Sequence, residues 1–168
     1  MLRGRRDLNA LVGALVMATV VAGCSAQSAS DHEGHDGESV VTINGEIPPN
    51  KPTPLTGSTV IVDVVEDGQR RVVFRDERPA GTRSPIHEHP YGGVTCMVSG
   101  EMTLYLEGSE PQTVGPGQCY SMPPGTPMTG VNTGDGVAVL FDIFTVPEGE
   151  AVWKVVEEGQ QDLQESFG

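Results

Sequence analysis

The fold of this chain is decided by two short stretches, residues 81–89, which read GTRSPIHEH, and residues 117–125, which read GQCYSMPPG. The first stretch ends in two histidines, His87 and His89, with one residue between them. Residues i and i+2 of a β-strand point to the same side, so both imidazoles are expected to face one pocket. The second stretch ends in Pro-Pro-Gly, which is typical of a tight turn leading into the next strand.

The surrounding sequence has the pattern of an all-β domain. Short runs of β-branched and aromatic residues alternate with Gly, Pro and Asp turns. Met102, Leu104 and Leu106 alternate with other residues, as in a half-buried strand, whereas Val137–Val146 is apolar on both faces, as in a central strand. This spacing predicts an antiparallel sandwich or small barrel. The expected strands are Thr59–Val65, Arg70–Asp76, Gly93–Ser99, Glu101–Glu107, Gln118–Met122, Val137–Val146 and Ala151–Val156.

Together the two stretches resemble the two motifs of the cupin superfamily. The first family motif is Gly, five residues, His-x-His, then a glutamate and a closing Gly; the second is Gly, five residues, Pro-x-Gly, then a histidine and an Asn. The resemblance implies an all-β, antiparallel, jelly-roll-like cupin β-barrel over residues 57–147. The matching positions of this chain are Gly81, His87, His89, Gly100, Gly117, Pro123, Gly125 and Asn132.

The resemblance also implies a metal site, of which this chain keeps half the usual ligands. Gly93 stands at the family's glutamate position, and Met128 at the position of its third histidine. Iron and manganese prefer nitrogen and carboxylate oxygen, whereas two imidazoles with a soft thioether suit copper better. The expected metal ligands are therefore His87, His89 and Met128, and the favoured ion is a single copper. Tyr91 could add an oxygen to this site or could simply pack.

Three functions remain open for the predicted pocket. The first is a non-catalytic pocket that binds a small molecule or nothing, with the methionine as apolar lining. The second is metal binding, because a buried histidine pair needs a partner. The third is a metal-dependent enzyme, an oxidoreductase or isomerase acting on a small polar molecule, as many cupins are. No catalytic residue can be named, and no serine or cysteine is spaced to suggest a hydrolase.

The first 24 residues are typical of a bacterial lipoprotein signal. Basic residues stand at positions 3, 5 and 6, and an apolar run follows at Leu11–Val21. The run ends in Val-Ala-Gly-Cys, which resembles the lipobox and predicts removal of residues 1–23 and acylation of Cys24. We therefore expect an exported protein whose lipid anchor holds it on the membrane, facing outside the cytoplasm.

Two further cysteines, Cys96 and Cys119, would lie in a compartment that permits oxidation. In cupins the strands that contain these two positions are neighbours in one sheet. The resemblance therefore implies a disulfide between Cys96 and Cys119.

The remaining segments are predicted to lie outside the barrel. Residues 24–56 are expected to form a flexible acidic tether, in which His32 and His35 could weakly hold a divalent metal or could be incidental. Residues 148–168 are expected to form an acidic tail, whose Gln-rich end after the possible strand at 151–156 frays, with Trp153 packed on the barrel exterior.

The charge and the resemblance restrict the partners. The formal net charge of -13 at pH 7 repels phosphates, so no nucleic-acid partner is expected. The expected partners are the membrane, through the lipid anchor, and an unidentified small molecule. Many cupins associate through strand edges, so the resemblance also implies a homodimer.

Overall fold

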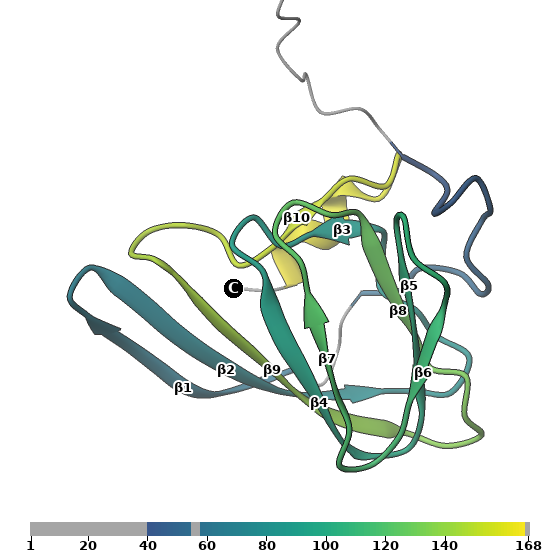
Figure 1. The fold of residues 1–168 in the computed structure, drawn as a ribbon, viewed down its shortest axis with the longest axis horizontal. Helices are drawn as coiled ribbons and strands as arrows, with labels where there is room; N and C mark the ends of the chain where they lie inside the picture. The colour runs from purple at the N-terminus through teal and green to yellow at the C-terminus, as the bar shows by residue number, and fades with distance from the viewer. Residues whose placement is uncertain (1–39, 55–57, 167–168) are drawn as a thin grey trace, which may run out of the picture. The chain divides into compact units, whose positions relative to one another are not determined.

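The computed structural model describes residues 40–54 and 58–166 and shows two five-stranded antiparallel sheets (Figure 1). The first sheet has the strand order β1-β2-β9-β4-β7, and the second has the order β10-β3-β8-β5-β6. The strands of the first sheet are β1 (Thr59–Glu66), β2 (Gln69–Arg78), β9 (Ala138–Pro147), β4 (Gly93–Ser99) and β7 (Cys119–Met122). Those of the second are β10 (Lys154–Val155), β3 (His87–Glu88), β8 (Met128–Val131), β5 (Met102–Leu106) and β6 (Gln112–Val114).

The predicted signal segment, with Cys24, lies outside the described residues, as do His32 and His35. No helix in the described part of the chain is long and apolar enough to cross a membrane. The described residues also contain a short 3₁₀ helix, η1 (Gln161–Ser166).

The two sheets enclose a common core. On β9, the middle strand of the first sheet, every second residue from Ala138 to Val146 is buried. The same core cluster takes Phe74 and Leu140 from the first sheet and Leu104 and Met128 from the second. The all-β antiparallel fold and the central position predicted for the strand at 137–146 are therefore confirmed.

Most predicted strands are observed within two residues of their expected ends. The segment 151–156 is the exception, because only Lys154–Val155 is extended there. The structure adds three strands that the sequence pattern did not predict separately, β3, β6 and β8. Each has two to four residues, which is too short for a two-residue period to be recognised.

The folded domain is longer than the predicted range of 57–147. Val40 forms a parallel bridge with Glu157, and Ile43 is buried in a cluster with Ile86 and Val156. Both flanking segments therefore contribute apolar residues that the barrel covers. Residues 40–54 and 148–166 thus each contribute side chains to the packed core, although we expected a flexible tether and an acidic tail outside the barrel.

A buried ion pair holds the C-terminal segment to the chain before β3. Both terminal nitrogens of the Arg83 guanidinium donate to the Glu157 carboxylate at 2.7 Å, and the carboxylate also accepts from the backbone N–H of Ile86 at 2.7 Å. The same guanidinium donates through Nε to the carbonyl of Asn50. One side chain thus joins three separate segments of the sequence.

Candidate metal centre in the barrel

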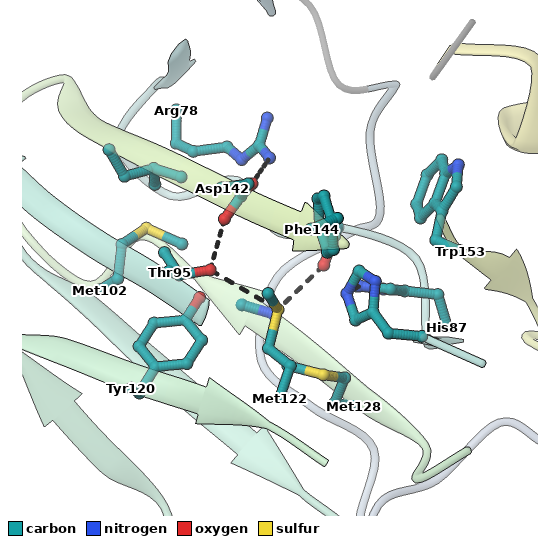
Figure 2. A pocket seen from close by; sticks show the side chains of 14 residues that line it. Arg78, His87, Thr95, Met102, Tyr120, Met122, Met128, Asp142, Phe144 and Trp153 are labelled. Carbon is teal, nitrogen blue, oxygen red and sulfur yellow. Dashed lines mark hydrogen bonds and ion pairs between the residues drawn. The ribbon is translucent and has the colours of Figure 1, made fainter. Parts of the chain in front are cut away.

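The structure brings the three predicted metal ligands to one cavity between the sheets (Figure 2). His87 lies on β3 directly opposite Met128 of β8, and His89 follows one residue after β3. All three side chains are buried. Cross-strand partners have Cβ atoms about 4.5–5.5 Å apart, so the register of the two strands places the His87 and Met128 side chains next to each other.

Nδ1 of each imidazole forms a hydrogen bond with a backbone carbonyl. Nδ1 of His87 donates to the carbonyl of Pro85 at 2.7 Å, and Nδ1 of His89 donates to the carbonyl of Val152 at 2.7 Å. A carbonyl oxygen can only accept, so each ring has its N–H on Nδ1. The two Nε2 atoms, which lie 3.1 Å apart, therefore both carry lone pairs and no proton.

Burial keeps these imidazoles neutral. It lowers the pKa of His89 to about 4, and together with the neighbouring His89 it lowers the pKa of His87 well below its usual value. A proton between the two Nε2 atoms is thus disfavoured. Two neutral imidazoles with unprotonated Nε2 atoms close together are expected for a pair of metal ligands. Histidine ligands usually donate their other ring N–H to a carbonyl, which fixes the tautomer and the orientation of the ring.

The packing around Gly93 leaves no room for the glutamate that the family has at this position. A Cβ on Gly93 would lie 2.6 Å from Cδ1 of Phe144 and 2.7 Å from Cε of Met122. The two larger side chains therefore occupy the space that a side chain at this position would need. The Phe144 ring stacks on His89, with ring centroids 4.8 Å apart.

Trp153 lines the cavity, and the prediction that it packs on the barrel exterior was wrong. Its ring meets His87 edge to face, with centroids 5.0 Å apart, and the residue is buried. Tyr91, in contrast, is largely exposed and does not line the cavity. Met122 is a lining residue that the sequence analysis missed, although it stands two positions after the inward-facing Tyr120.

The cavity has a volume of about 30 Å³. A buried water needs at least about 10–15 Å³ on this scale, so there is room for a metal ion or one or two waters. Within the described residues, no three His, Cys, Asp or Glu side chains gather in a way that could hold a metal. Thioethers also line the cavity, those of Met102, Met122 and Met128.

Residues 74–144 match the family model described as Cupin domain. The fold is a cupin barrel. A search of curated protein sequences found no match.

Solved structures that resemble the chain have low identity to it. A double-stranded β-helix protein from Klebsiella pneumoniae is 18% identical, with a TM-score of 0.47, over 65% of this chain and 91% of that chain. A cupin family protein from Methanocaldococcus jannaschii is 22% identical, with a TM-score of 0.45, over 61% and 91%. The DMSP lyase DddQ from Ruegeria pomeroyi is 24% identical, with a TM-score of 0.45, over 58% of this chain and 46% of the lyase.

The cupin barrel also encloses a charged cluster that the sequence analysis did not identify. Asp76 and Arg78 of β2 and Asp142 of β9 are buried, and the last two line the same cavity as the histidines. Figure 2 shows Arg78, Asp142 and Thr95 on one side of the cavity and His87 with Trp153 on the other. The signal was present in the sequence, because Asp76 and Arg78 continue the inward alternation of Val72 and Phe74.

A disulfide joins Cys96 of β4 to Cys119 of β7. The two residues are direct cross-strand partners, and their Cα atoms lie 4.1 Å apart. Asn132, the last motif residue, has a structural role, because its side-chain amide donates to the carbonyls of Arg78 and Gly136. It thereby closes the loop that follows β8.

Proposed function

We propose that the cupin barrel binds one cuprous ion between Nε2 of His87 and Nε2 of His89, with the Met128 thioether as the third ligand. The observation that carries this proposal is the 3.1 Å distance between the two Nε2 atoms. Each ring is held in place by a hydrogen bond from Nδ1 to a backbone carbonyl. Imidazole–metal bonds are about 2.0–2.1 Å long for zinc, so both nitrogens can reach one ion.

The composition of the cavity wall favours copper over iron or manganese. The carboxylate that would complete an iron or manganese site is replaced by Gly93, and the space beside it is taken by Phe144 and Met122. Soft thioether sulfur selects cuprous copper, whereas hard cations need oxygen ligands. A bound cuprous ion would supply a redox-active centre inside the barrel.

The small cavity argues against an organic ligand inside the barrel. Sites for organic ligands usually measure about 300–1,000 Å³, whereas this cavity measures about 30 Å³. This comparison favours metal binding over both a small-molecule pocket and an enzyme that encloses an organic substrate. Acting on a small polar molecule would require the barrel to open.

The decisive experiment is metal titration of the full chain, with His32 and His35 replaced by Gln to remove competing imidazoles. Cuprous ion should bind one to one, and iron and manganese should bind poorly. His87→Ala and His89→Ala should each abolish binding. Met128→Leu, which nearly conserves volume, should weaken cuprous binding and preserve the fold.

The matched control is Met97→Leu, because Met97 is a buried methionine of β4 that does not line the cavity. Its affinity for cuprous ion should equal that of the parent chain. Absence of cuprous binding tighter than about 10 micromolar, which corresponds to roughly 7 kcal/mol, would contradict the proposal. So would binding that persists in a His87→Ala, His89→Ala double variant.

We further propose that the copper site faces the outside of the cell on a lipid anchor. The support is the sequence alone: a basic start, an apolar run and a lipobox that ends in Cys24. Cys24→Ser should prevent uptake of labelled fatty acid and move the protein out of the membrane fraction. A Cys24→Ser protein that stays in the membrane, with no label on the parent protein, would contradict the anchor.

The homodimer stays a prediction. The observation that favours it is the edge strand β1, on which all eight residues are exposed, including Ile61, Val64 and Val65. Exposed apolar edge strands are sites of pairing between chains.

A further inference from the structure

The charged cluster beside the copper site contains two carboxylates and one cation. Asp76 is completely buried, and Asp142 and Arg78 are less than a tenth exposed. Nη2 of Arg78 lies 3.2 Å from Oδ2 of Asp76 and 3.7 Å from Oδ2 of Asp142, so one nitrogen serves both acids. With both acids ionised, the barrel interior would hold an uncompensated negative charge, which is strongly destabilising.

Two buried polar atoms of the cluster have no hydrogen-bond partner among the described residues, Oδ1 of Asp76 and Nη1 of Arg78. Thr95 donates its hydroxyl proton to Oδ1 of Asp142, and Arg78 donates to Oδ2 of Asp76. No N–H or O–H of the described residues reaches the buried Oδ1 of Asp76. A proton on the Asp142 carboxyl would balance the charge of the cluster, leaving one carboxylate, Asp76, beside the Arg78 guanidinium.

We propose that Asp76 and Asp142 share one proton, carried on Asp142, and that this proton is exchanged for the cation that enters the cavity. This inference rests on the proposed copper site. Entry of a cuprous ion adds one positive charge to the buried cavity. Breaking the O–H bond of Asp142 and releasing the proton to solvent removes one, so the buried charge is unchanged and no electron is transferred.

The surroundings of Asp142 support this assignment. Burial, followed by the hydrogen bond to Asp76, raises the pKa of the Asp142 carboxyl well above its usual range, and Arg78 and Thr95 oppose the shift. Tyr120 of β7 also faces the cluster, and its pKa is raised by burial and by Asp142, so its phenol stays protonated. The histidines contribute no proton to the exchange, because their N–H groups remain bonded to the Pro85 and Val152 carbonyls.

The test combines infrared spectroscopy with cuprous titration of the full chain, with His32 and His35 replaced by Gln. The metal-free protein at pH 7 should show the C=O band of one protonated carboxyl, which Asp142→Asn removes. The conservative control is Asp63→Asn, because Asp63 pairs with Arg70 on the exposed hairpin. It should leave the band unchanged.

Adding cuprous ion should abolish the band and release about one proton per ion, counted by calorimetry in two buffers of different ionisation enthalpy. Release of one proton makes the affinity rise tenfold per pH unit. In Asp142→Asn the affinity should be independent of pH between 6 and 8, and no proton should be released.

The outcomes separate the two proposals. Copper binding with an unchanged carboxyl band, or with equal proton release in Asp142→Asn, overturns the exchange and leaves the copper site intact. Absence of the band from the metal-free protein overturns the exchange whether or not copper binds. A band with no copper binding overturns the copper site, and the exchange with it.

Discussion

Single residues determine what the barrel can hold. Gly93 leaves room for Phe144 and Met122, and these side chains occupy the space that a carboxylate ligand would need. The sequence indicated that the glutamate is absent, because the motif can be counted back from Gly100. It could not indicate what fills the space, since Phe144 is 51 positions away in the chain and meets Gly93 only through the pairing of β4 with β9.

Gly93→Ala should destabilise the protein. The added methyl group would lie within 2.7 Å of Phe144 and Met122, which is too close without displacement. Overpacking of this kind costs about 1–3 kcal/mol. The free energy of unfolding from chemical denaturation measures the loss. Gly115→Ala is the control, because the nearest atom to its new Cβ is 3.8 Å away, and equal losses in the two variants would contradict the steric account.

The histidine pair should make the metal-free protein sensitive to acid. Burial holds the pKa of His89 at about 4 and that of His87 well below its usual value, whereas both are near 6.5 in the unfolded chain. The unfolded state therefore binds more protons below pH 6.5, so this contribution to stability is lost as pH falls from 6.5 toward 4.

Unfolding free energies of the parent chain and of a His87→Gln, His89→Gln variant, measured at several pH values, test this dependence. The parent should lose more stability than the variant between pH 6.5 and pH 4. Asp142 acts in the opposite direction, because its raised pKa favours the folded state as pH falls, but it is common to both chains. Parallel pH profiles would contradict the buried, neutral histidine pair.

At the scale of the elements, the sequence predicted the ends of the long strands but not those of the short ones. A strand such as Gly93–Ser99 shows its pattern over seven residues, whereas β3 has two and is defined only by its partners β8 and β10. The inward charges of β2 and β9 follow from the two-residue period, but Asp76, Arg78 and Asp142 become a cluster only when the sheet order places β2 beside β9. That order is not a property of any local sequence pattern.

The disulfide should stabilise an edge strand. β7 is the last strand of its sheet and pairs there with β4 alone, so Cys96–Cys119 is its covalent attachment to the sheet. A cross-link that closes a loop of this size contributes about 3 kcal/mol. Replacement of both cysteines by Ala should lower the unfolding free energy by that amount. Mass spectrometry after alkylation without reductant should find no modified thiol at these positions, and two modified thiols would contradict the bond.

At the scale of the whole molecule, the segments on either side of the predicted barrel complete it. Val152 supplies the carbonyl that orients His89, and Trp153 covers His87. The copper site therefore depends on residues beyond position 147, where the sequence has no motif to mark them. The sequence analysis predicted a strand at 151–156 but not that this run enters the core, where Val152, Trp153, Val155 and Val156 are buried.

Glu157→Gln should weaken the attachment of this C-terminal segment. It removes the charge from a buried pair with Arg83, and breaking such a pair costs about 3–5 kcal/mol. Glu77→Gln is the control, since its pair with Arg75 is largely exposed and should contribute at most about 1 kcal/mol. The two losses in unfolding free energy should differ clearly, and similar losses would contradict the role assigned to the buried pair.

The measurement that most directly tests the copper site is X-ray absorption of the cuprous-loaded full chain, with His32 and His35 replaced by Gln. The predicted first shell contains two nitrogen neighbours and one sulfur neighbour, and in Met128→Leu the sulfur neighbour should be lost while both nitrogens remain. A first shell without sulfur in the parent chain, or one that is the same in Met128→Leu, would contradict the site formed by His87, His89 and Met128.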